Sequence, residues 1–336
     1  MLAKKLEAAE TRRRPHFNAL FRLITIAALF ISVCFFSGSA ADLNGFSEAL
    51  EYEEALKASN RSEIELLKIS KADKPMDLSV FSNLKKLRVS FCKDARFIKN
   101  IPETLEVLDI EDSAGVCLRD INRNCPRLKV LAVRQCENAS VTGKTPDSLE
   151  ELLIEVCEKL TLSVAFLQVK KLTIIDTTFT NQVRLNLADF RKLEEARFYG
   201  CEKLFLSGNF PVSLQKLHII NNGMIPFAIN LTDCVNLEEL SVSQEINSVD
   251  FGKKSGLKSL QVHDSESFEL VGELPRSLEY VDFFQVNFAE KVEVDLRVFA
   301  NLKNIDVSDC ENFSLVQENE LKKEPTQNGR GFKAVM

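Results

Sequence analysis

The sequence predicts a repeat solenoid of the α/β type with about 12 coils, mostly β-strand and irregular structure, a concave parallel β-sheet and few convex helices. The first observation is a recurring pattern of three apolar residues, separated by two free positions and then by one. The pattern opens at Ile64, Leu84, Leu105, Leu128, Leu149, Val169, Leu193, Leu214, Leu237, Leu257, Leu278 and Leu302. The openings lie 20 to 24 residues apart, and such a period is typical of solenoids.

A second observation is a longer period of 109 residues, which relates Leu84 to Leu193 and Leu193 to Leu302. The same interval relates three further pairs of openings. Duplication of a block of five coils would explain this spacing.

The composition agrees with a continuous core and limits the kinds of partner. Apolar residues make up 45% of the chain, with 24 Phe and no Trp, which argues against disorder. The chain has 43 basic and 49 acidic residues, a net charge of −6. Proteins that bind nucleic acid concentrate Lys and Arg on one face, so we expect no nucleic-acid partner.

Residues 1–41 have the layout of a signal peptide or signal anchor. A basic leader precedes an apolar run at residues 23–36, and small residues follow at 37–41. Cleavage would leave a mature chain that begins at Ala41 or Asp42. A run of fourteen residues is short for a membrane span, but an uncleaved anchor with the repeats outside stays open. We expect membrane contact only through this segment.

Four Asn residues stand in glycosylation sequons, which is compatible with an exported glycoprotein. They are Asn60, Asn138, Asn230 and Asn312.

Two segments flank the repeats. Residues 42–63 are rich in Glu and Ala, with apolar residues at helical spacing, so we expect a helical cap over the open end of the first coil. The solenoid itself is predicted for residues 64–316. Residues 317–336 are polar and contain Pro325, and we expect a disordered tail.

Each coil is expected to begin with a short strand. In the second coil Leu87 and Val89 would point into the core, and Arg88 toward the concave face. A second apolar pair with period two, such as Leu160 and Leu162, predicts an extended segment on the convex side. A coil of this length has no room for a convex helix, so we expect little helix beyond the cap.

Two kinds of segment lead back into the strands. One has Pro three residues before the opening apolar residue, and the other has Phe or Cys there, as in Phe190 and Cys125. Pro would fix the backbone where the chain re-enters the strand. Phe would fill the core at the same corner.

With these motifs the chain resembles the leucine-rich repeat family from residue 64 to about 315. The resemblance implies an arc-shaped solenoid whose concave parallel sheet carries the ligand, most often a protein. The irregular coil lengths and the missing cysteine-rich caps leave the subfamily open.

Most of the nine cysteines are expected to be structural. Five of them stand three residues after the last apolar residue of a strand, namely Cys92, Cys136, Cys157, Cys201 and Cys310. In leucine-rich repeats this column turns inward and serves backbone groups of the turn. Cys136 and Cys157 lie in adjacent coils, and we expect a reduced pair rather than a disulfide.

The sequence offers no signature of catalysis or cofactor binding. It has no C-x-x-C pair, no Gly-rich phosphate loop, no nucleophile elbow and no metalloprotease helix. His218 and His263 would lie two coils apart, too far to share a metal. We therefore expect no catalytic residues, no metal and no cofactor.

The candidate contact site lies in the middle of the concave face. Read in order, this face is basic at the first coils, apolar in the middle and acidic at the end. The middle comprises Leu153, Val156, Ile175, Tyr199, His218 and Ile220. Contiguous exposed apolar groups mark contact sites, although isolated apolar residues are ordinary on any surface.

The sequence thus predicts a non-enzymatic, protein-binding protein that is secreted or tethered to a membrane with the repeats outside. Two alternatives remain at this point. One is an intracellular, membrane-anchored signalling adaptor, and the other is a structural surface component.

Overall fold

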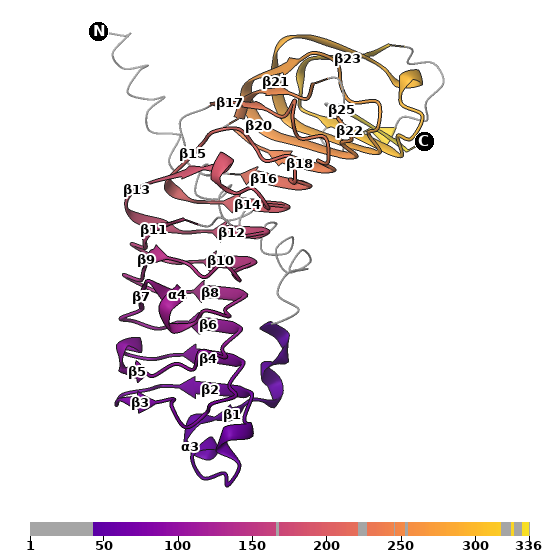
Figure 1. Ribbon diagram of the computed structural model, residues 1–336. Coiled ribbons are helices and arrows are strands. Elements are labelled where there is room, and N and C mark those ends of the chain that lie inside the picture. Colours follow the sequence, from indigo (N-terminus) through magenta and orange to yellow (C-terminus); the bar gives the residue numbers. More distant parts are fainter. Residues whose placement is uncertain are drawn as a thin grey trace, which may run out of the picture. The chain divides into compact units, whose positions relative to one another are not determined.

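The computed structural model describes residues 43–165, 168–220, 227–244, 246–252, 255–316, 324–325 and 331–335. The chain divides into two units, residues 1–47 and 48–336. The first unit contributes the start of the 3-10 helix η1 (Leu43–Glu48). The second unit is a parallel β-solenoid of about 12 turns, mostly strand with few helices, as predicted (Figure 1).

Each turn of the solenoid contributes one strand to a long main sheet. These strands are β2 (Leu66–Ser70), β4 (Lys86–Ser90), β6 (Val107–Glu111), β8 (Val130–Arg134), β10 (Glu151–Glu155), β12 (Lys171–Ile175), β14 (Glu195–Tyr199), β16 (Lys216–Ile220), β18 (Glu239–Val242), β20 (Ser259–Val271), β21 (Tyr280–Asp295) and β22 (Asn304–Ser308). Neighbours pair in parallel and in register, so that Leu87 has Leu67 and Leu108 as its Cα partners. The predicted repeat is therefore the structural repeat.

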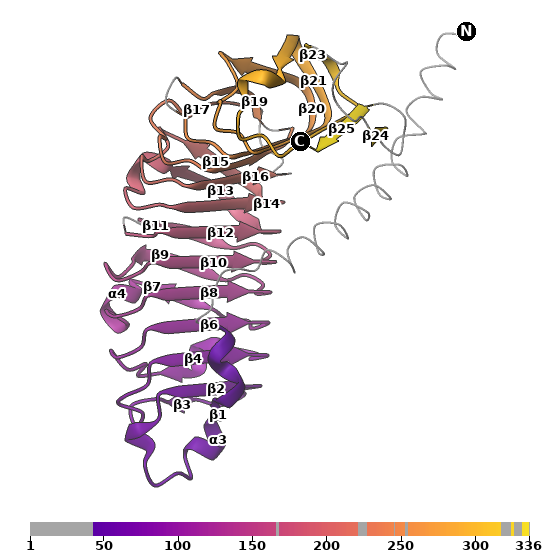
Figure 2. The same ribbon diagram turned by 90° about the vertical axis from the view of Figure 1, so that its right-hand side faces the viewer.

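A second set of strands lies across the core from the main sheet (Figure 1 and Figure 2). These strands are β3 (Met76–Asp77), β5 (Ile98–Lys99), β7 (Cys117–Arg119), β9 (Ser140–Lys144), β11 (Thr161–Ala165), β13 (Thr178–Asn186), β15 (Glu202–Ser207), β17 (Phe227–Asn230), β19 (Ile246–Asp250) and β23 (Glu311–Val316). They lie at or beside the second apolar pair of the coils. Leu204 and Leu206 are both within β15, whereas β11 holds Leu162 and begins one residue after Leu160. In the last turns β20 and β21 are long enough to contribute to both sides.

Helices are short throughout the described residues. They are α3 (Tyr52–Ala55), α4 (Ile121–Asn124) and the 3-10 helices η1, η2 (Arg61–Glu63), η3 (Ala95–Phe97), η4 (Leu187–Asp189) and η5 (Leu296–Val298). Among these residues no helix is long and apolar enough to cross a membrane. The predicted signal or anchor at residues 1–41 lies outside the described residues.

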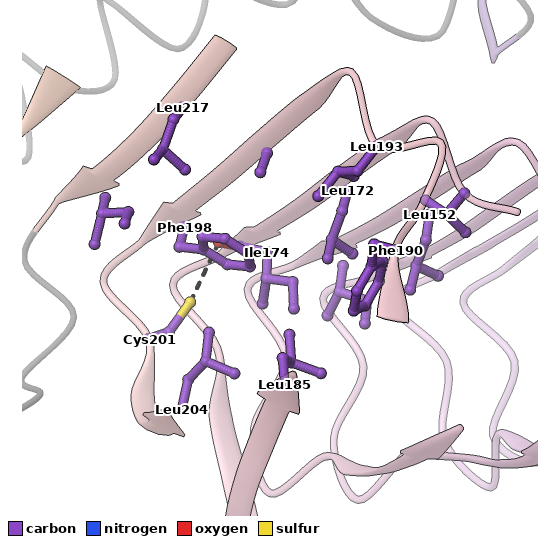
Figure 3. Close-up of a cluster of buried hydrophobic side chains, with 14 of the residues drawn as sticks. Leu152, Leu172, Ile174, Leu185, Phe190, Leu193, Phe198, Cys201, Leu204 and Leu217 are labelled. Carbon is purple, nitrogen blue, oxygen red and sulfur yellow. Dashed lines mark hydrogen bonds between the residues drawn. The ribbon is translucent and has the colours of Figure 1, made fainter. Parts of the chain in front are cut away.

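The core is one continuous stack of apolar side chains from Tyr52 to Val307. Strand alternation turns Leu172 and Ile174 inward, and the same positions of the neighbouring coils stack on them (Figure 3). Phe190 fills the corner where the chain re-enters the strand, as predicted, and is 3% exposed.

The Pro-type return segments carry a further contact that the sequence did not predict. A Ser or Thr directly before the opening Leu donates a hydrogen bond to the carbonyl of the opening residue one coil earlier. Thr104 does so to Leu84 at 2.8 Å, and Ser148 to Leu128 at 2.8 Å. These bonds tie consecutive coils together at the corner.

Most main strands lead into a corner residue with left-handed backbone conformation. These residues are Lys71, Phe91, Asp112, Gln135, Val156, Asp176, Gly200, Asp264, Gln285 and Asp309. Among them Gly200 alone has no Cβ and adopts this conformation without a steric cost. The corner amide donates to a carbonyl of the next coil, as Val156 does to Ile175 at 2.9 Å. This regular bond offsets the conformational cost.

The cysteine column turns inward as predicted. The thiol of Cys157 donates to the carbonyls of Val133 and Glu155, both at 3.4 Å. Cys201 does the same to Ile174 and Tyr199, both at 3.2 Å. The column thus satisfies carbonyls of its own coil and of the preceding one.

The N-terminal cap is less helical than predicted. Within residues 48–63 a short strand, β1 (Leu50–Glu51), pairs in parallel with β2, and α3 follows directly. Tyr52 packs edge-on against Phe81 with ring centroids 6.0 Å apart, and its hydroxyl contacts the backbone of Asp77. A strand can satisfy the backbone groups of the sheet edge, which a helix cannot.

The C-terminal segment also departs from the prediction of a disordered tail. Residues 331–335 form β25 (Gly331–Val335), which pairs antiparallel with β22. A two-residue strand, β24 (Glu324–Pro325), pairs with β25. The remaining residues of the predicted tail lie outside the described residues.

Candidate functional site

The main sheet carries a row of apolar side chains on the face opposite the core. Ile175, Tyr199 and Ile220 are the last residues of β12, β14 and β16, and each is the Cα partner of the next. Neighbouring strands lie about 4.8 Å apart, so the three side chains are adjacent. All three are half-buried. We call these three residues the apolar row.

The two titratable rings of this region, Tyr199 and His218, are uncharged at neutral pH. Burial, together with a smaller effect of the Arg197 charge, lowers the pKa of His218 to about 4. Burial raises the pKa of Tyr199 to about 12. The two rings lie 6.2 Å apart, tilted by 47°. A neutral aromatic pair therefore borders Ile220.

Ion pairs beside the row compensate one another. Arg197 contacts Glu195 at 2.5 Å within β14, and Lys216 contacts Glu239 at 2.7 Å between β16 and β18. Compensated charges offer little net attraction to a partner. The apolar row is therefore the feature of this region that gains most from being covered.

Two further predicted contact residues, Leu153 and Val156, differ from the apolar row in their exposure. Leu153 lies on the same face, between Ala132 and Thr173, but is only 6% exposed and presents almost no surface. Val156 is 45% exposed at a left-handed corner with φ of 51°. A β-branched residue in this conformation costs about 1–2 kcal/mol, and its exposed side chain recovers little of that by burial.

The structure adds a residue that the sequence did not single out. Phe91 occupies the same kind of corner as Val156, three coils earlier, with φ of 54° and 54% exposure. Its signal in the sequence is an apolar residue two positions after the last inward residue of the strand. That signal can be recognised only once the corner is known.

Two carboxylates border the row at its N-terminal end. Glu155 is the Cα partner of Ile175, and Asp176 follows Ile175 at the corner. Burial raises the pKa of both. For Glu155 the charge of Arg134 opposes this shift, and the acidic neighbours Asp109 and Glu111 add to it. These partly desolvated carboxylates favour a positively charged group beside the apolar surface.

The ends of the face are charged as predicted, but some of these charged side chains form ion pairs with one another. At the basic end Arg88 binds the fully buried Asp109 at 2.7 Å. At the acidic end Asp282 and Asp306 are Cα partners, and His263 lies 3.3 Å from Asp282.

His218 and His263 are separated by strand β18, as predicted. Within the described part of the chain, no group of three or more His, Cys, Asp or Glu could hold a metal ion. All eight described cysteines are free thiols, including the neighbours Cys136 and Cys157.

All four sequon asparagines are exposed. Asn312 donates from Nδ2 to the carbonyl of Phe288 at 2.8 Å, so the atom that a glycan would modify is already bonded. At Asn230 the side-chain oxygen accepts from the hydroxyl of Thr232 at 2.6 Å and leaves Nδ2 out of that bond. The geometry favours Asn230 over Asn312 as an acceptor.

A cavity of about 490 Å³ lies between the last coils, across the core from the main sheet. Its apolar lining includes Phe268 and Phe299. Of its acidic residues, Glu273, Glu293 and Asp295 are engaged in ion pairs with neighbouring basic residues. The paired charges do not converge on a common point as they would in an active site.

Comparison with known proteins does not assign a family. No protein-family model matches the chain, and no curated protein is similar to it in sequence.

Proposed function

We propose that this protein is an exported, non-enzymatic member of the leucine-rich repeat class that binds a protein partner on the outer face of its main sheet. The observation that carries the proposal is the in-register adjacency of Ile175, Tyr199 and Ile220. Three apolar side chains in consecutive strands form a continuous surface, which aromatic and aliphatic groups of a partner can cover.

The border of the row suggests the chemistry of the partner. Burial raises the pKa of Glu155 and Asp176, and neither carboxylate forms a salt bridge among the described residues. Arg134 lies near enough to Glu155 to lower its pKa, but its guanidinium binds Asp109 and Glu111 instead. A partner that places Lys or Arg there, next to its own apolar residues, would stabilise both carboxylates. We therefore infer a partner segment that combines a basic residue with an apolar one.

A photo-crosslinking experiment tests the site before the partner is identified. A photoreactive phenylalanine replaces Tyr199 in one variant and Glu202, an exposed residue across the core, in a matched control. The proposal expects a specific crosslinked protein from position 199 that is absent from position 202. Equal labelling at both positions would contradict it.

Affinity for the crosslinked partner then tests the individual residues. Ile175→Ser, Tyr199→Ala and Ile220→Ser remove apolar contact while adding no charge. We expect at least one of them to cost about 2 kcal/mol, roughly a thirtyfold loss of affinity. Glu158→Ala and Glu202→Ala are the controls. Undiminished binding by three folded row variants would place the site elsewhere.

Export is tested separately on the protein from its natural host. N-terminal sequencing should find a mature chain that begins at Ala41 or Asp42, and a glycosidase should shift its mobility. A chain that retains residues 12–14 would favour the anchor, and absence of any glycan would remove the support from the sequons.

A further inference from the structure

The last strand of the main sheet differs from the others in how it is paired. One side of β22 pairs in parallel with β21, as elsewhere in the stack. Its other side pairs antiparallel with β25 over five residues, from Asn304 opposite Val335 to Ser308 opposite Gly331. A terminal strand with a free edge would expose a row of unpaired backbone groups.

The two paired segments are complementary in residue type. Val307 has Phe332 as its Cα partner, and Ile305 has Ala334, so apolar residues stand opposite apolar residues. Asp306 stands between them, opposite Lys333. Directly opposed pairs of these kinds stabilise antiparallel sheets.

We propose that the outer edge of β22 is an acceptor site for an extended peptide of apolar–basic–apolar sequence, and that Gly331–Val335 occupies it as an internal competitor. The site uses the backbone edge of the last coil rather than the face of the sheet. It is therefore independent of the apolar row.

Gly331–Val335 is short enough for a competing peptide to replace it. A five-residue strand on one edge contributes few backbone hydrogen bonds, and β24 supports it over only two residues. The occupant is favoured by its covalent attachment, because fourteen residues separate it from Val316. A tether of that kind gives an effective concentration of about 1 mM. A competing peptide must overcome this advantage unless the internal strand is weakened.

The test uses the full-length chain and a fluorescent peptide with the sequence of residues 329–336. In the variant Phe332→Asp/Ala334→Asp the internal strand places new carboxylates opposite the apolar residues Val307 and Ile305 and should be released. We expect this variant to bind the peptide at least tenfold more tightly than the wild-type chain does, and a scrambled peptide not at all.

A charge reversal at Asp306 distinguishes specific pairing of the peptide with β22 from nonspecific binding. Asp306→Lys in the released variant should weaken binding of the natural peptide at least tenfold. A peptide carrying Lys333→Asp should restore binding to the Asp306→Lys protein, which also shows that the acceptor is folded. Hydrogen exchange at those amides of residues 304–308 that point toward β25 should be fast in the released variant and slow again with peptide, whereas the amides bonded on the β21 side should stay protected.

Three results would overturn the proposal. They are a released variant that is folded but does not bind the peptide, equal binding of the scrambled peptide, and a charge reversal with no effect. Substitutions in the apolar row should leave peptide binding unchanged, so failure here is distinguishable from failure of the proposed function.

Discussion

Arg134 holds Asp109 through two parallel hydrogen bonds between neighbouring strands of the main sheet. Nε contacts Oδ1 at 3.0 Å and Nη2 contacts Oδ2 at 2.8 Å. Arg88 binds the same carboxylate from the preceding strand at 2.7 Å, and the Asp109 side chain has no exposed surface. One carboxylate therefore links three consecutive coils.

The first prediction concerns this link. Asp109→Ala should lower the free energy of unfolding by about 3–5 kcal/mol, because it leaves two partly buried guanidinium groups without their shared partner. Denaturant unfolding of both proteins measures the loss. Glu65→Ala, which breaks the exposed pair with Lys85, is the control and should cost less than about 1 kcal/mol. Similar losses in both variants would show that Asp109 is not a structural link.

The second prediction concerns the inward column. Cys157→Arg should destabilise the protein by about 3–5 kcal/mol, because it buries a charge without a partner. Cys157→Ser should cost about 1 kcal/mol, since a hydroxyl can donate to the same carbonyls. Thr177 already does this in the next coil, with Oγ1 donating to Ile175 at 2.8 Å. Thermal unfolding of the two variants should rank them in this order, and equal melting temperatures would refute the inward orientation.

The third prediction concerns pH. Because burial lowers the pKa of His218 from 6.5 to about 4, the unfolded chain binds a proton at this residue between these pH values and the folded chain does not. His218 therefore lowers stability progressively as the pH falls from about 6.5 to 4, by up to about 3 kcal/mol. Other groups titrate in the same range, so the measurement is the difference in unfolding free energy between wild type and His218→Gln. A difference that does not change with pH would contradict the burial of the imidazole.

The fourth prediction concerns thiol reactivity. Burial raises the pKa of Cys157 and of Cys201 to about 12, whereas Cys117 is exposed in β7. A thiol reagent at pH 8 should therefore modify Cys117 well before the other two, because the thiolate is the reactive form. Mass spectrometry of peptides after short labelling times gives the order. Early modification of Cys157 would mean that the column opens readily.

Local pattern was sufficient to predict the coils because alternation and period are properties of neighbouring residues. Leu87 and Val89 had to face one way and Arg88 the other, whatever the rest of the chain did. The exposure of the outward residues could not be predicted in this way. Leu153 and Ile175 both alternate outward, but Leu153 is 6% exposed whereas Ile175 is half-buried, and alternation along a strand does not contain this difference.

The repeat pattern was enough to predict the solenoid, its number of turns and the scarcity of helix, since these follow from the length and number of the repeated units. The inward cysteine column was predicted from the resemblance to leucine-rich repeats. How the repeat ends depends instead on contacts between distant parts of the chain. At the first coil β1 extends the sheet, and at the last coil Gly331–Val335 returns to pair with β22. Terminal strands must find partners for backbone groups that inner strands share with both neighbours, and those partners lie in segments that carry no repeat.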